Sequence, residues 1–147
     1  MSVARTTRLY HKLQIAAHRV QKTTDQVVAE ASGLTSAQSA VLSIVSAVPG
    51  ISQRDLAGQL SLNESAVTAM VTRLIGDGLL AREKSPSDKR VWVLGLTQSG
   101  VEKLHQITAP FSQVNERMET ALSDDEIRQL ASLLVKLSDA FSKTDSH

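Results

Sequence analysis

The sequence has no cysteine and very few aromatic residues. Without a thiol, the protein cannot form disulfide bonds, thiolate metal sites or a thiol-based redox sensor. Phenylalanine, tryptophan and tyrosine make up only 3% of the 147 residues, so the hydrophobic core must consist of leucine, valine, isoleucine and alanine. A chain of this length is expected to form one domain with a substantial core.

Long hydrophobic runs are also lacking. No run approaches the ~20 apolar residues that a membrane-spanning helix needs, and residues 1–8 lack the apolar segment of a signal peptide. We therefore expect a cytoplasmic protein with no membrane partner. The formal net charge of +1 neither supports nor excludes nucleic-acid binding, because a DNA-binding dimer needs positive charge on one side rather than over its whole surface.

The sequence shows no catalytic arrangement either. It has no Ser–His–Asp arrangement and no phosphate-binding glycine loop, and Asp124 and Asp125 are better explained as charges that favour the start of a helix. His11, His18 and His105 do not have the spacing of a compact metal motif, so we expect them in solvent or at an interface. The sequence thus predicts a protein that is not an enzyme and that holds no cofactor and no metal.

The most informative stretch runs from Ser52 to Leu96. Asn63 is a favourable N-cap, and the residues after it predict a helix with one apolar stripe, formed by Val67, Met70, Val71 and Leu74. The opposite face carries short side chains, those of Ser65, Thr68, Ala69 and Thr72. Because this face lacks the Glu/Lys pairs of an ordinary solvated helix, it can approach the floor of a groove closely.

A shorter helix is predicted directly before this one. Ser52 and Asp55 form a capping-box-like start, and Leu56 begins its apolar side. Only Ser61 and Leu62 separate the two helices, which is the spacing of a helix–turn–helix.

Two strands are predicted after the helix–turn–helix. Gly76–Gly78 ends the helix, and residues 79–84 and 91–96 are rich in strand formers joined by a basic tip, residues 85–90. Ile51 is expected to add one more pair to this hairpin. Together these elements form a winged helix, which is primarily a DNA-binding architecture.

Long helices with apolar stripes are predicted on both sides of this core. They cover residues 8–31 and 36–48 before it, and they begin at Thr97 and Ser123 after it. Pro110 is expected to bend or divide the helix that starts at Thr97, since proline cannot donate a backbone hydrogen bond. Ser123 and Glu126 form a capping box for the last helix.

The middle of the chain resembles the MarR family of bacterial transcription regulators. The matching segments are Leu34–Gln38 with Val41 and Leu42, Ser52–Ala57, Val67–Leu74, Gly78–Arg82, Asp88–Arg90 and Leu96–Gly100. The resemblance implies a homodimer whose recognition helices enter successive major grooves of double-stranded DNA while the wings reach the flanking minor grooves. It also implies repression that is relieved by a small ligand, often an aromatic acid.

We therefore predict a mostly α (α+β) fold with two functional regions. Residues 34–100 form the winged helix-turn-helix DNA-binding region, and residues 1–33 and 101–147 form a helical, intertwined dimerisation region. Each buried Leu, Ile or Phe contributes ~1.5–3 kcal/mol, so the long apolar stripes are expected to pack against a second copy. A monomer in which these helices fold back on themselves is the alternative.

The candidate DNA contacts follow from these elements. The recognition helix offers Ser65, Thr68, Ala69, Thr72 and Arg73, the wing offers Lys84, Asp88, Lys89 and Arg90, and Gln53 and Arg54 are candidates for backbone contacts. Arg90 at the hairpin tip is expected to enter a minor groove. In the family the matching acid orients a nearby arginine, so Asp88 is expected to pair with Arg73 or with Arg90.

Two departures from the family pattern bear on base recognition. Relatives often carry arginine where this chain has Ala69, and Glu64 places a negative charge at the helix start, where phosphate is normally favoured. Both weaken the expectation that this helix recognises guanine. They leave open a second hypothesis, in which the winged helix is a protein–protein interaction module with weak or no DNA binding.

An effector site is implied only by the resemblance, which places it between the winged core and the dimer helices. The candidates are His11, Arg19 and Gln38 as polar groups, with Ile15, Ala40 and Ile44 as walls. Trp92 is expected to pack beneath the wing, although an indole could also line a ligand pocket.

Overall fold

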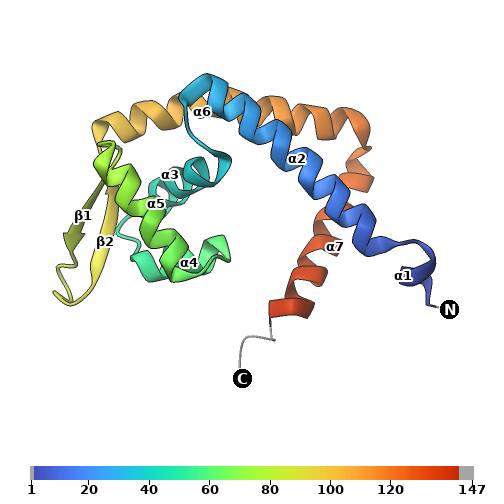
Figure 1. Ribbon diagram of the computed structural model, residues 1–147, viewed down its shortest axis with the longest axis horizontal. Coiled ribbons are helices and arrows are strands. Elements are labelled where there is room, and N and C mark those ends of the chain that lie inside the picture. Colours follow the sequence, from blue (N-terminus) through green and yellow to red (C-terminus); the bar gives the residue numbers. More distant parts are fainter. Residues whose placement is uncertain (1, 143–147) are drawn as a thin grey trace. The chain divides into compact units, whose positions relative to one another are not determined.

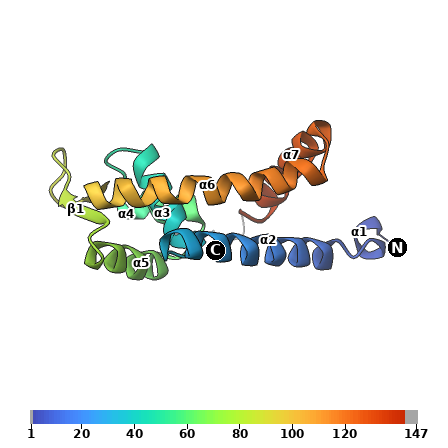
Figure 2. The same ribbon diagram turned by 90° about the horizontal axis from the view of Figure 1, so that it is seen from above.

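The computed structural model describes residues 2–142, which form helices and one two-stranded antiparallel sheet (Figures 1 and 2). The elements in chain order are α1 (Val3–Thr6), α2 (Leu9–Ser32), α3 (Ser36–Ala47), α4 (Gln53–Leu60), α5 (Glu64–Gly76), β1 (Leu80–Lys84), β2 (Trp92–Leu96), α6 (Gln98–Ala121) and α7 (Asp124–Ser142). The mostly helical winged fold that the sequence predicts is confirmed. The chain divides into two compact units, residues 1–111 and residues 112–147.

Aliphatic side chains form the core of the first unit, as the low aromatic content requires. The largest fully buried side chains include Leu42, Leu56, Leu74 and Ile107. In α5, Val67, Val71 and Leu74 are completely buried, which confirms the predicted apolar stripe. This stripe fixes which face of α5 points outward.

Side-chain caps begin the two helices of the helix–turn–helix. The Asn63 Oδ1 atom accepts a hydrogen bond from the backbone N–H of Ala66 at 2.8 Å, and Ser52 Oγ accepts one from Asp55 at 3.1 Å. Between the helices, Ser61 adopts a left-handed conformation with φ of 53°. These local bonds set the tight turn that places α5 beside α4.

The wing is the hairpin β1–β2, which extends away from α3, α4 and α5 (Figure 1). Its register runs from the pair Leu80–Leu96 to the pair Lys84–Trp92. The expected extra pair is present: Ile51 accepts a hydrogen bond from the Leu94 N–H at 2.9 Å, and the bridged residue is its neighbour, Ser52. The base of the hairpin is buried, since Leu80 and Leu94 are each only 2% exposed.

Trp92 does not pack beneath the wing, so that prediction is wrong. Its side chain is 45% exposed, because it is the first residue of β2 and lies next to the wing loop, beyond the buried base of the hairpin. Its ring instead faces two cations, with the Arg82 guanidinium carbon at 5.2 Å and Lys84 Nζ at 5.5 Å from the ring centroid.

The end of the wing is tied to the start of α6. Thr97 Oγ1 donates a hydrogen bond to the Gly78 carbonyl at 2.6 Å and accepts one from the Gly100 N–H at 3.0 Å. A Cβ atom at Gly100 would overlap the carbonyl oxygen of Leu79, so the backbone of α6 can approach only because residue 100 is glycine. This contact gives the Leu-Thr-x-x-Gly segment a structural role.

The helices before the winged core are joined by polar contacts at their ends. Thr35 and Gln38 form a capping box at the start of α3, and Asp25 Oδ1 accepts a hydrogen bond from the Ser36 N–H at 2.9 Å. From α6, Lys103 Nζ donates a hydrogen bond to the carbonyl of Ser32, the last residue of α2, at 3.0 Å.

The short helix α1 was not predicted from the sequence.

Helix α6 is a single helix (Figure 2) with Pro110 inside it, so of the two expected effects, a bend or a division, the division is not found. In the second unit, the predicted capping box of α7 is present: Ser123 Oγ accepts from the Glu126 N–H, and the Glu126 carboxylate accepts from the Ser123 N–H at 3.0 Å. Among the described residues, no helix combines the length and apolar composition needed to cross a membrane.

Candidate nucleic-acid interface

The outward face of α5 consists of short side chains, and those of Ser65, Thr68, Ala69 and Thr72 are all exposed. Two of the hydroxyl groups donate their protons within the helix. Thr68 Oγ1 donates to the Glu64 carbonyl at 2.7 Å, and Ser65 Oγ donates to Asn63 Oδ1 at 2.8 Å. A hydroxyl has one proton and two lone pairs, so in this arrangement Ser65 and Thr68 offer acceptors to a partner.

The two helices of the helix–turn–helix share a side-chain hydrogen bond. Gln53 Nε2, at the start of α4, donates to Thr68 Oγ1 at 2.8 Å. Both residues were predicted as separate DNA contacts, and the structure brings them together. Gln53 keeps its carbonyl oxygen and a second N–H for another partner.

Arg73 lies in the last turn of α5 and pairs with Asp77, the residue that caps the same helix. Its Nε atom is 3.9 Å from Asp77 Oδ2, four residues further along. The pairing of Asp88 with Arg73, one of the two alternatives, is therefore not found. The Arg73 side chain is 73% exposed, so this ion pair is weak and leaves the guanidinium accessible.

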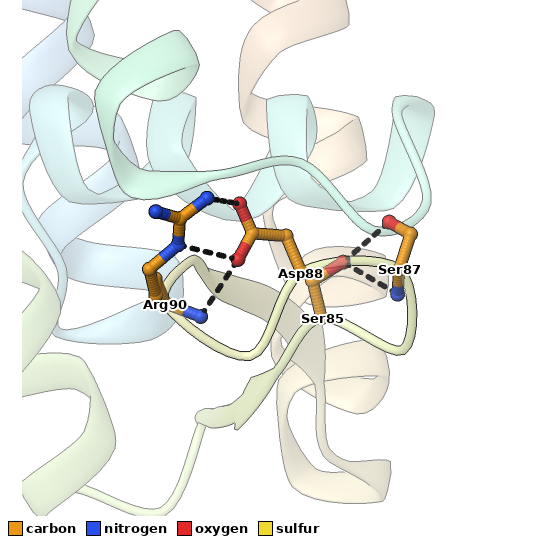
Figure 3. Close-up of polar contacts among 4 residues, drawn as sticks. All are labelled: Ser85, Ser87, Asp88 and Arg90. Carbon is orange, nitrogen blue, oxygen red and sulfur yellow. Dashed lines mark hydrogen bonds and ion pairs between the residues drawn. The ribbon is translucent and has the colours of Figure 1, made fainter.

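Asp88 pairs with Arg90 within the wing loop (Figure 3). Asp88 Oδ1 accepts hydrogen bonds from the Arg90 backbone N–H at 3.0 Å and from Nε at 3.1 Å, and Oδ2 accepts one from Nη2 at 3.3 Å. The hydrogen bonds from the side chain and then the backbone of Arg90 lower the pKa of Asp88 below its ordinary value. The carboxylate therefore stays ionised and holds the guanidinium, whose side chain is 91% exposed.

The rest of the wing loop is ordered by two serines. The hydroxyls of Ser85 and Ser87 lie 3.0 Å apart, and the Ser87 N–H donates to Ser85 Oγ at 3.4 Å (Figure 3). Lys84 and Lys89, the predicted phosphate contacts, are exposed on either side of this turn. The loop thus presents its basic side chains to solvent.

An open groove of about 640 Å³ lies between the wing and the start of α4. Three arginines from separate parts of the chain line it: Arg54, Arg82 and Arg90. Arg54 and Arg90 were predicted as DNA contacts. Arg82 was missed, although its alternation with Lys84 along β1 places both on one sheet face and could have indicated it.

The candidate effector residues occupy different environments. His11, Ile15 and Arg19 follow one another at every fourth residue of α2, in its exposed N-terminal half. Gln38 Oε1 accepts from the Thr35 N–H in the capping box, while Ala40 and Ile44 are partly buried on α3. Within residues 2–142, no group of three or more His, Asp or Glu side chains is arranged to hold a metal ion.

Comparison with known proteins places this geometry among transcription regulators. The sequence profile of the MarR family matches residues 34–92. A putative transcriptional regulatory protein for the hcr operon of Thauera aromatica is 31% identical over 134 residues, which is 91% of this chain and 79% of that protein. The regulator BilQ of Clostridium symbiosum is 33% identical over 60% of this chain, and the match spans 62% of its own length.

Two solved structures have closely similar folds. The transcriptional repressor CouR bound to a 23-mer DNA duplex superposes with a TM-score of 0.83 at 31% identity, over 92% of this chain and 96% of that one. The PcaV regulator of Streptomyces coelicolor in complex with its natural ligand gives a TM-score of 0.76 at 27% identity, over 95% of this chain and 97% of that one.

Proposed function

Since this chain belongs to the MarR family of transcription regulators, we propose that it is a homodimeric repressor that binds an operator and is released by a small aromatic or phenolic ligand. Family membership makes it a DNA-binding transcription regulator rather than an enzyme. The operator, the dimer and the effector are the parts that the proposal adds.

One observation carries the operator-binding part of the proposal. The outward face of α5 between Glu64 and Arg73 carries the short side chains of Ser65, Thr68, Ala69 and Thr72, and it lies in the same unit as a hairpin whose tip holds an exposed arginine. A helix with such a face can enter a major groove closely, where Thr68 and Thr72 would contact base edges and Ala69 a thymine methyl. Arg90, oriented by Asp88, would insert into the adjacent minor groove.

The homodimer is supported by apolar side chains that the described residues leave uncovered. On α2, Leu9, Leu13 and Val20 lie along one side of the helix and are between 42% and 45% exposed. On α7, Leu133 is 55% and Phe141 is 76% exposed. Exposing two such stripes to water is unfavourable by ~25 cal/mol per Å², and a two-fold-related copy would cover the same stripes on both chains.

In this proposal the dimer helices and the winged core have separate tasks. Residues 1–33 and 101–147 would join the protomers, and residues 34–100 would contact DNA. Two recognition helices would then lie about one helical turn of DNA apart, and the operator would be a near-palindrome.

Effector release is supported by the relative PcaV, whose structure holds a natural ligand. In this chain we infer that His11, Arg19 and Gln38 would supply polar contacts and that Ile15 and Ile44 would form the walls. The guanidinium of Arg19 can bind a carboxylate with two hydrogen bonds. A ligand that binds better to a dimer with mis-spaced recognition helices would shift the population away from DNA.

Selection of bound duplexes from a random pool tests the operator. The wild-type protein is expected to enrich a near-palindrome, and its affinity should fall steeply with salt concentration. Thr68→Ala should change the consensus in the half-sites, and Arg90→Ala should change the flanking positions. No enrichment together with a flat salt dependence would contradict the proposal.

A second candidate function has one observation in its favour, since the exposed Glu64 lies in the first turn of α5, where it repels phosphate. A winged-helix module for protein partners would tolerate this charge. It predicts that no duplex is enriched and that Arg90→Ala changes no binding property. Glu64→Gln separates the two, because it should strengthen DNA binding only if α5 meets DNA.

A further inference from the structure

Trp92 is the single tryptophan of the chain and is half exposed at the wing, where it makes no contribution to the core. The strand register places it directly opposite Lys84 and diagonally opposite Arg82, all on one face of the hairpin. The distances of 5.2 Å from the Arg82 guanidinium carbon and 5.5 Å from Lys84 Nζ to the ring centroid are typical of cation–π contacts. One indole ring thus contacts two cations.

The contrast with Arg90 shows what this arrangement does electrostatically. Arg90 is held by a carboxylate, which orients it but also cancels much of its charge. Among residues 2–142 the ion pairs involve Arg73, Arg90 and Arg128, so Arg82 and Lys84 have no acidic partner there. An aromatic ring attracts a cation through its quadrupole and leaves the net charge unchanged. Both cations are therefore oriented while their charge stays available to an anion.

The groove beside this cluster points to the nature of that anion. Arg82 and Trp92 line its wing side, while Gln53 and Arg54 at the start of α4 line the other. The groove is open, its side opposite the wing belongs to α4 of the helix–turn–helix, and its lining also includes the carboxylate of Asp55. A polyanionic strand in this groove would meet Arg82 and Arg54, and Lys84 lies next to Arg82 on the same face of β1.

We propose that Trp92 is a positioning residue for DNA, which holds Arg82 and Lys84 toward phosphate groups of the backbone beside the wing. This inference rests on the proposed function, since it concerns the same duplex. It assigns a task to Arg82 and Trp92, and it explains why an indole lies exposed on the wing. The contact is to the backbone, so it does not depend on base sequence.

The test measures affinity and its salt dependence by fluorescence anisotropy with two labelled duplexes, one selected by the wild-type protein and one of scrambled sequence. Arg82→Gln and Lys84→Gln should each reduce the slope of log K against log salt by about 1.8 on both duplexes, because each substitution removes one phosphate contact from both chains of the proposed dimer. Lys136→Gln, a lysine substitution on α7, should leave the slope unchanged. Unchanged slopes for Arg82→Gln and Lys84→Gln would overturn the proposal.

The role of the ring is tested in two backgrounds. Trp92→Leu should weaken binding about twofold to fivefold in the wild-type chain, and it should have no effect when Arg82 and Lys84 are both glutamine. Trp92→Phe keeps an aromatic face and should restore most of the affinity. An equal loss in both backgrounds would overturn the positioning role, because the ring would then act through another contact. Thermal unfolding of each variant checks that the fold is intact.

The tryptophan also supplies its own signal. Since Trp92 is the only source of indole fluorescence, its emission should change as the scrambled duplex saturates the protein. Constant emission at saturation would show that DNA does not approach the ring and would overturn the proposal. The two failures are distinguishable: loss of the proposed operator binding would appear as no enriched duplex in the selection, whereas failure of this inference would appear as unchanged salt slopes and constant emission on a duplex that still binds.

Discussion

The amide nitrogen of Gln53 donates to the hydroxyl of Thr68 at 2.8 Å, and this bond joins the two helices of the helix–turn–helix through their exposed side chains. Thr68 gives its own proton to the Glu64 carbonyl, so its hydroxyl is held from both sides. The pair therefore acts as one unit in which each residue fixes the rotamer of the other.

This pairing predicts that Gln53 and Thr68 contribute to DNA binding in a coupled way. In a double-mutant cycle with Gln53→Ala and Thr68→Val, the coupling free energy should be about 0.5–1.5 kcal/mol. Thr72→Val, one turn further along the same face, is the matched control and should combine additively with Gln53→Ala. Additive losses for Gln53 and Thr68 would show that the bond has no part in binding.

Asp88→Ala should weaken DNA binding, although it removes a negative charge from the wing. The carboxylate orients Arg90, and the loss of that constraint should reduce affinity about fivefold. Because the pKa of Asp88 is lowered by its bonds with Arg90, the pair should persist at every pH used for binding. Glu83→Ala on β1 removes a carboxylate that forms no ion pair within residues 2–142, and it should leave affinity equal or higher. Tighter binding by Asp88→Ala would contradict the orienting role.

Gly100→Ala should destabilise the fold by about 1–3 kcal/mol. Its Cβ would overlap the Leu79 carbonyl oxygen, a backbone atom that cannot move aside easily. Gly95→Ala is the control, because a Cβ there meets no atom within 4 Å and its φ is not positive. Urea unfolding of both variants measures the difference, and equal stability would refute the close approach of α6.

Asp25 should make the stability of the protein depend on pH in the acid range. Hydrogen bonds from the side chain and backbone of Ser36 lower its pKa from 3.8. The unfolded chain binds a proton more readily, so the stabilisation is complete above the unfolded pKa and is lost as the pH falls through the folded pKa. Asp25→Ala should remove this pH dependence and cost about 1 kcal/mol at neutral pH, since the first N–H of α3 loses its acceptor. Urea unfolding at neutral pH and near pH 3 checks both effects.

Leu133→Asp should convert the proposed dimer into a monomer. Its side chain is 55% exposed on α7, and a carboxylate there would be costly to bury between two copies. Light scattering should give the mass of one chain for this variant and of two chains for the wild type. Gln129→Asp, one turn earlier on the same helix, places the same charge on a polar position. If all three proteins had the mass of two chains, this stripe would not be part of the dimer interface.

Local patterns in the sequence predicted most elements of the fold. The caps at Asn63 and Ser123 and the stripe of Val67, Val71 and Leu74 are all found. Each depends on residues three or four positions apart, which meet in any helix regardless of the rest of the chain. The hairpin was predicted for the same reason, because its strands are adjacent in sequence and joined by a short turn.

Predictions that depended on distant or competing contacts were less complete. Trp92 was expected to pack beneath the wing, but the strand pattern does not show where β2 leaves the core, and the side chain is 45% exposed. Asp88 had two possible partners, Arg73 and Arg90, and the structure shows that it pairs with Arg90 within the wing loop. Pro110 was expected to bend or divide α6, and the structure excludes the division, since the helix continues across a buried Pro110.

By itself, the amino-acid sequence determined the helix–turn–helix, the wing and the short-side-chain face of α5, because periodicity and caps act within a few residues. Three contacts became visible only in the tertiary structure. Gln53 donates a hydrogen bond to Thr68, the backbone of Leu79 packs against Gly100, and the Trp92 ring contacts Arg82 and Lys84. Each of these is a contact between separate elements. Such contacts depend on how the buried faces pack, which local pattern does not specify.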